Sequence, residues 1–163
     1  MKAFVVDVNV AIVANGKEAP HADLSCRSAC VDALDGITKN GLIVLDDGRR
    51  ILSEYQRYLS PNGQPGLGDA FMQWVWENQA VATRCEQVSI TPTGAGVDDF
   101  AEFPSDPMLS NFDRSDRKYV AVALASRKSP VVLNAVDADW WQHKDALTKN
   151  DVHIRFLCPQ NMQ

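Results

Sequence analysis

The sequence lacks the features of a membrane or secreted protein. No apolar run approaches the roughly 20 residues that a membrane-spanning helix needs. The first residues pass directly into a strand-like segment, without the apolar region and small-residue cleavage site of a signal peptide. We therefore expect no signal peptide, no membrane partner and a cytoplasmic location.

Positive charge is also scarce. The net charge is −5, which argues against a protein that coats nucleic acid through bulk charge. It leaves room for an enzyme that contacts nucleic acid locally, through a small basic rim. No GxxxxGK[ST] or GxGxxG loop is present to cradle nucleotide phosphates. A G-x-S-x-G motif and a Ser/His/Asp order are missing too.

Cysteine has none of the spacings of a zinc site. The four residues are Cys26, Cys30, Cys85 and Cys158, with no CxxC pair and no cysteine–histidine cluster. A chain of 163 residues can bury roughly 70% of its unfolded surface, so it needs no disulfide in order to fold. We expect four reduced cysteines with a structural role.

Strand-like and helix-like segments alternate along the chain. Apolar runs predict strands at 3–7, 42–47, 87–91, 131–135 and 152–158. Apolar residues three and four apart predict helices at 21–41, 49–60, 69–81, 111–128 and 140–150. The alternation favours a single α/β domain over residues 1–163, a three-layer α/β/α sandwich with a mostly parallel sheet.

Carboxylates follow the expected strands. Asp7 ends the first strand, and Asp137 and Asp139 follow the strand at 131–135. Function collects at the carboxyl ends of parallel strands, so these acids should gather at one edge of the sheet. Asp46 and Asp47, which end the second strand, are interpreted as a solvated turn.

Each acid also has a purely structural interpretation. Asp7 could accept hydrogen bonds from loop amides, and Asn9 could be a turn residue. Asp113 and Asp116 could cap the helix that follows them, as Asp137 and Asp139 could cap the next one. Taken together, several carboxylates held close repel one another unless they bind protons or a hard cation. Oxygen ligands alone suit Mg²⁺ or Mn²⁺ and the hydrolysis of phosphodiesters.

The stretches VVDVNVAIVA and ILSEYQRYL resemble motifs of the PIN-domain family of metal-dependent ribonucleases. In the first, Asp7 matches the first acid of the family, with Asn9 at the position beside it. In the second, Glu54 matches the second acid. By itself, Glu54 is an ordinary residue near the buried face of its helix.

Two later stretches extend the resemblance over nearly the whole chain. DRSDRKYVAVALAS resembles the helix that carries the third acid at Asp116, with Asp113 as an extra acid one turn earlier. VVLNAVDADW resembles the strand that ends at the fourth acid, Asp137, with Asp139 next to it. The family usually has Ser or Thr close before the fourth acid, whereas this chain has Asn134. The choice between Asp137 and Asp139 is therefore open.

The resemblance implies an α/β/α sandwich with an acidic pocket that holds Mg²⁺ or Mn²⁺ and cleaves RNA. Asp7, Glu54, Asp116 and Asp137 would be the catalytic acids and, with Asp139, the metal ligands. Many small bacterial members of the family are toxins neutralised by an antitoxin protein, and homodimers are common. The alternatives are a PIN-like scaffold that binds RNA or a partner without cutting, and an aspartate-based phosphatase. The phosphatase would need D-x-D where this chain has Asp7-Val8-Asn9.

Basic residues cluster near two of these acids. They could contact RNA phosphates or form an ordinary solvated surface; they are Arg49, Arg50, Arg114, Arg117 and Lys118. Trp140 and Trp141 could stack on bases, although core packing is their commoner role.

Overall fold

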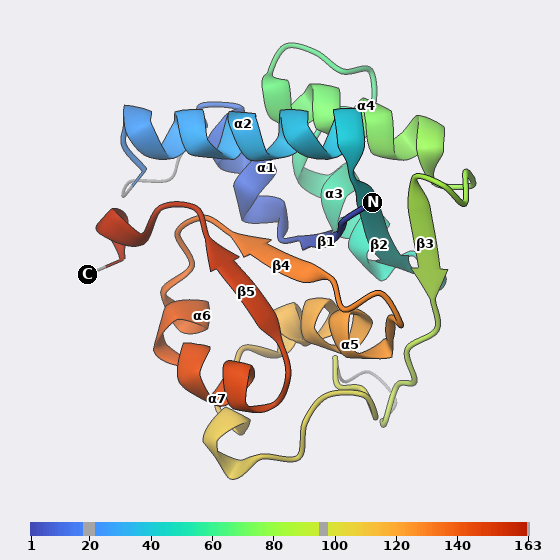
Figure 1. Cartoon of the computed structure of the whole chain (residues 1–163), viewed down its shortest axis with the longest axis vertical. Helices are drawn as coiled ribbons and strands as arrows, with labels where there is room; N and C mark the ends of the chain where they lie inside the picture. Colours follow the sequence, from blue (N-terminus) through green and yellow to red (C-terminus); the bar gives the residue numbers. More distant parts are fainter. Residues whose placement is uncertain (18–21, 95–97, 163) are drawn as a thin grey trace.

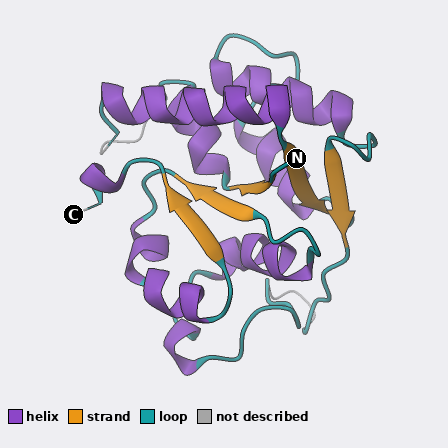
Figure 2. Cartoon of the chain, viewed as in Figure 1, coloured by secondary structure: helices purple, strands orange, loops and turns teal. Residues whose placement is uncertain are grey.

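One parallel sheet organises the chain. The computed structural model describes residues 1–17, 22–94 and 98–162. Its five strands are all parallel and lie in the order β3-β2-β1-β4-β5 (Figure 2). They are β1 (Ala3–Val6), β2 (Leu42–Asp46), β3 (Cys85–Val88), β4 (Val131–Asn134) and β5 (His153–Phe156). The chain therefore starts in the middle of the sheet and adds strands first on one side and then on the other.

Helices cover both faces of this sheet, which confirms the three-layer α/β/α architecture. Figure 1 shows α2 and α4 along one face and α5, α6 and α7 along the other. The helices are α1 (Val8–Ala14), α2 (Leu24–Asn40), α3 (Arg50–Tyr58), α4 (Leu67–Asn78), α5 (Arg117–Ala125), α6 (Ala138–Gln142) and α7 (Lys144–Lys149). Within the described parts of the chain, no helix combines the length and the apolar character needed to cross a membrane.

The central strands form the core. Every residue of β1 and β2 is buried, as expected for parallel strands with helices on both faces. The edge strands β3 and β5 are only partly buried. The hydrophobic pattern therefore locates the inner strands well, and it fixes where the residues that follow them must lie.

Helix α1 was not predicted from the sequence. It begins directly after β1, and the side chain of Asp7 caps it by accepting a hydrogen bond from the backbone N–H of Asn9 at 3.1 Å. Its valines have low intrinsic helix propensity, which hides the helix in the sequence. Val10 and Val13 are buried, and α1 packs against α2 and α4, so tertiary contacts stabilise it.

Other helix boundaries differ from the prediction in detail. Asp23 caps α2, and Gly41 ends that helix; residue 21, the first of the expected range, lies outside the described residues. Helix α4 begins at Leu67, two residues earlier than expected, so Asp69 lies in its first turn. The helix expected over 140–150 is divided at His143 into α6 and α7.

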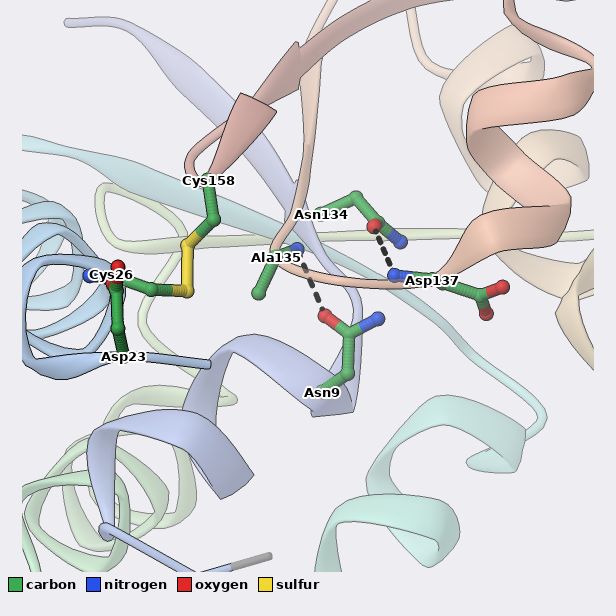
Figure 3. Close-up of a disulfide and its surroundings, with 7 residues drawn as sticks. All are labelled: Asn9, Asp23, Cys26, Asn134, Ala135, Asp137 and Cys158. Carbon is green, nitrogen blue, oxygen red and sulfur yellow. Dashed lines mark hydrogen bonds between the residues drawn. A yellow bond between two sulfur atoms is a disulfide. The ribbon is translucent and has the colours of Figure 1, made fainter. Parts of the chain in front are cut away.

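The prediction of four reduced cysteines is wrong for two of them. Cys26 on α2 and Cys158 after β5 form a disulfide (Figure 3), while Cys30 and Cys85 are free and buried. The two partners are 132 residues apart, so no local spacing could reveal the pair. Disulfides persist mainly in oxidising compartments and are rare in the cytosol, so this one does not favour the expected cytoplasmic location.

Candidate acidic metal site

Three carboxylates from distant parts of the sequence meet at one edge of the sheet. Oxygens of Asp7, Asp116 and Asp137 all lie within 4.8 Å of one another. Asp7 follows β1, Asp137 follows the neighbouring strand β4, and Asp116 immediately precedes α5. The strand order reverses between β1 and β4, which is where open parallel sheets form their binding crevices.

Asp7 is held firmly in this position. Its backbone N–H donates to the carbonyl of Leu133 at 3.1 Å, which continues the pairing of β1 with β4. One carboxylate oxygen accepts the N–H of Asn9, and the other accepts the side-chain amide of Asn134 at 3.2 Å. Asp7 therefore caps α1 and also points into the acidic cluster, so its two interpretations are compatible.

Asn134 is the site residue that sequence reasoning did not select. Its side chain is fully buried and joins two of the acids, because it donates to Asp7 and accepts the backbone N–H of Asp137 at 3.1 Å (Figure 3). The backbone carbonyl of Asn134 accepts the backbone N–H of Leu157 at 2.9 Å. The sequence signal for this role is a polar residue at the end of a buried strand, which the resemblance marks only as a departure from the family pattern.

Asn9 supports the same edge from α1. Its side-chain oxygen accepts the backbone N–H of Ala135 at 3.0 Å (Figure 3). This bond ties the start of α1 to the turn that follows β4. Asn9 thus fixes the relative position of Asp7 and Asp137 without joining the three carboxylates.

The structure places Asp137, and not Asp139, among the three carboxylates. Asp137 also caps α6 by accepting the N–H of Asp139 at 2.9 Å. The carboxylate of Asp139 accepts the N–H of Asp113 at 2.8 Å and lies 3.2 Å from Nδ1 of His143. Asp113 in turn accepts hydrogen bonds from Ser115. Asp113 and Asp139 therefore shape the turn before α5.

Glu54 lies beside the cluster on α3. Its Oε2 accepts a hydrogen bond from Nζ of Lys118 at 3.0 Å, and its Oε1 accepts the hydroxyl of Tyr119. The same Tyr119 oxygen accepts the N–H of Val8 at 3.3 Å. The charge of Glu54 contributes to the raised pKa of Asp7, which shows that the two carboxyl groups interact.

Burial makes the cluster hold protons when no cation is bound. Desolvation raises the pKa of Asp7 to about 7, assisted by the charges of Asp137 and Glu54 and opposed by the N–H of Asn9. Desolvation, with the charges of Asp7 and Asp137, raises the pKa of Asp116 to about 9. The pKa of Asp137 is also raised, chiefly by burial. Near neutral pH these acids therefore need protons or a positive charge among them.

The donor set fits a hard divalent cation. Octahedral Mg²⁺ has ligands at about 2.0–2.1 Å, which places neighbouring ligand atoms about 3–4 Å apart. The three carboxylates lie within 4.8 Å of one another, so a small adjustment brings them to that spacing. Among the described residues, the cluster around Asp7 contains neither thiolate nor imidazole, so it suits Mg²⁺ or Mn²⁺ better than zinc.

Four of the five basic residues singled out in the sequence line a pocket of about 320 Å³ next to Glu54. They are Arg49, Arg50, Arg114 and Lys118. Arg117 does not belong to this group. It is buried, its Nε donates to the carbonyl of Phe112 at 3.2 Å, and its Nη1 donates to Asp99 at 3.2 Å. Its guanidinium holds the loop before α5 and is not available to a substrate.

One further expectation, for Asp46, is wrong, and another, the core packing of Trp140, is confirmed. Asp46 is not a solvated turn residue: it is buried and accepts the N–H groups of Arg50 and Ile51, both at 2.9 Å, which are the first two of α3. Trp140 is fully buried, with its ring edge-on to Phe112, so it belongs to the core and cannot stack on a base.

Comparison with known proteins adds no family to this description. No protein-family model, no curated protein and no solved structure matches the chain.

Proposed function

We propose that this protein is a metal-dependent endoribonuclease that hydrolyses RNA phosphodiester bonds with Mg²⁺ or Mn²⁺. The observation that carries the proposal is the close approach of three carboxylates, Asp7, Asp116 and Asp137, within 4.8 Å at the reversal of strand order. Burial makes full ionisation of this cluster unfavourable without a cation. The three carboxylates therefore suit hydrolysis that uses a bound hard cation.

The residues divide the work in a simple way. Asp7, Asp116 and Asp137 would hold the cation, which when bound activates water and neutralises charge on the phosphate. The side chain of Asn134 holds the carboxylate of Asp7 and the backbone N–H of Asp137, so it orients one acid and fixes the backbone of the other. Glu54 lies outside the three, where Tyr119 and Lys118 hold its two oxygens, and in this proposal it would orient the attacking water.

The choice of RNA as substrate has two supports. The first is the order of acids, Asp7, Glu54, Asp116 and Asp137, whose surrounding motifs resemble those of PIN-domain ribonucleases. The second is the basic pocket next to Glu54, which gives an acidic chain a local site for phosphates. An antitoxin partner and a homodimer are predictions that follow from the resemblance alone.

RNA cleavage tests the proposal. Wild-type protein, Asp7→Asn and Asp35→Asn are incubated with labelled single-stranded RNA in Mg²⁺, Mn²⁺ or EDTA. Asp35 is an exposed acid on α2, so its variant is the matched control for loss of one carboxylate. We expect cleavage by the wild type and the control in either metal, none in EDTA, and none by Asp7→Asn with an intact circular dichroism spectrum.

Three outcomes would contradict the proposal. Cleavage by Asp7→Asn at the wild-type rate would show that the cluster is not the site of chemistry. Binding of Mn²⁺ and RNA by the wild type without cleavage would instead support the inactive scaffold. A phosphoryl group trapped covalently on Asp7 would favour the phosphatase.

A further inference from the structure

The pocket beside Glu54 concentrates positive charge in an otherwise acidic protein. It lies between α3 and the segment that leads into α5 and has a volume of about 320 Å³. Two carboxylates, Glu54 and Asp98, also line it, so cations outnumber anions by three. The five cationic side chains are Arg49, Arg50, Arg57, Arg114 and Lys118.

The protein itself neutralises only part of this charge. Lys118 pairs closely with Glu54, at 3.0 Å. The contacts of Arg50 with Asp46, at 3.7 Å, and of Arg114 with Asp99, at 4.0 Å, are long. Among the residues described by the structure, no carboxylate oxygen lies within 4.0 Å of the Arg57 guanidinium. Arg57 and Arg114 are thus poised to pair with an anion from outside the chain.

The lining favours a phosphate group over a base. Arginine side chains offer forked N–H donors that match phosphate oxygens, and the serine side chains of the pocket add O–H donors. Phe100 is the aromatic residue of the pocket, but it is buried and the guanidinium of Arg50 lies over its ring at 5.3 Å. Its face is therefore not open for stacking.

The pocket adjoins the acidic site through Glu54 and Lys118, whose charges both act on Asp7. Glu54 and Lys118 line it, and Tyr119 connects Glu54 to the start of α1 directly after Asp7. An anion held in the pocket would thus lie next to the three carboxylates without occupying their place.

We propose that this pocket is a subsite for one phosphate group of the nucleic acid, adjacent to the bond that is cut. The assignment rests on the proposed nuclease function for its biological meaning, but phosphate binding can be measured without cleavage. The phosphate belongs either to an internal phosphodiester or to a terminal phosphomonoester. Both offer the same oxygen acceptors, and they differ in charge and in position on the strand.

The test measures binding of six-nucleotide single-stranded RNAs by fluorescence anisotropy over a range of salt concentrations. The RNAs carry either a 5′-phosphate or a 5′-hydroxyl, and Ca²⁺ replaces Mg²⁺ so that binding is read without turnover. Full-length wild type is compared with Arg57→Ala and Arg114→Ala. Arg127→Ala is the matched control, because Arg127 is exposed and follows the far end of α5. Arg57 and Arg114 are exposed as well, and thermal unfolding verifies that every variant folds.

We expect each pocket variant to bind about tenfold more weakly. The slope of log affinity against log salt should become shallower by about 1. The control should match the wild type. A loss confined to the 5′-phosphorylated RNA would identify a terminal phosphate, and an equal loss with both RNAs an internal one.

The proposal is overturned if the wild type binds neither RNA, if both pocket variants keep the wild-type affinity and slope, or if Arg127→Ala weakens binding as much as they do. Failure of the proposed nuclease appears separately, either as RNA that the wild type binds but does not cut or as cleavage that survives in Asp7→Asn.

Discussion

Replacing Asp116 by Asn should stabilise the protein at alkaline pH when no metal is bound. Asp116 is buried, and desolvation with the charges of Asp7 and Asp137 raises its pKa to about 9. The interaction of its carboxyl group with that of Asp137 raises the pKa of Asp116 and opposes the rise in the pKa of Asp137, as expected when Asp116 donates the hydrogen bond. An asparagine amide can donate the same bond while carrying no charge. The variant therefore imitates the protonated acid at every pH.

The sign of the pH dependence follows from the direction of the shifts. In the unfolded chain these acids titrate near the ordinary value of 3.8, whereas the folded protein holds their protons to higher pH. The folded state therefore binds more protons above pH 4, and the free energy of unfolding must fall as the pH rises. The fall continues through pH 7 for Asp7 and towards pH 9 for Asp116.

The magnitude is large relative to a typical domain stability of about 5–15 kcal/mol. One pKa unit corresponds to about 1.4 kcal/mol. Between pH 5 and pH 8, Asp7 contributes a loss of about 3 kcal/mol, because its pKa is about 7. Asp116 contributes up to about 4 kcal/mol more, because its pKa lies above this range.

Urea unfolding in EDTA at pH 5, 6, 7 and 8 measures this effect. We expect a steep loss of stability for the wild type, a clearly shallower loss for Asp116→Asn, and recovery of the wild type at pH 8 on addition of Mg²⁺. The control Asp35→Asn should follow the wild type. A wild-type stability that is constant or rises from pH 5 to pH 8 would refute the reasoning, as would a variant as steep as the wild type.

Two further predictions concern the supports of the site. Reduction of the Cys26–Cys158 disulfide, which closes a long loop, should lower the free energy of unfolding by about 2–4 kcal/mol in urea titrations; equal stability with and without reductant would contradict it. Asn134→Ala removes a hydrogen bond from each of Asp7 and Asp137 and should destabilise the protein by about 2–3 kcal/mol. It should also weaken Mn²⁺ binding measured by calorimetry, and unchanged affinity would show that Asn134 does not position the acids.

The inner strands were predictable because their physics is local. In β2, residues 42–45 form an unbroken apolar run before Asp46, and a strand with helices on both faces needs that pattern. The rule that carboxyl ends of parallel strands share an edge then placed Asp7 and Asp137 together before any coordinates. The choice between Asp137 and Asp139 depends on three-dimensional contacts, which place Asp137 in the cluster.

The missed features depend on distant residues. The valines of α1 favour a strand by propensity and form a helix only because α2 and α4 pack against them. Cys26 meets Cys158 because β5 ends beside α2, far away in sequence. Arg117 carries the same charge as Arg114, but the carbonyls of a loop bury its guanidinium. Charge in a sequence does not show whether a side chain faces solvent.

Calorimetric titration with Mn²⁺ tests the central claim most directly, because it asks whether the acidic cluster binds a cation at all. The comparison of Asp137→Asn with Asp139→Asn is the sharpest available, since the two acids are two residues apart and only Asp137 lies among the three carboxylates. The account predicts that the wild type and Asp139→Asn bind Mn²⁺ and that Asp137→Asn does not. A wild type that binds no Mn²⁺, or an Asp137→Asn variant that binds it as tightly as the wild type, would contradict the metal site.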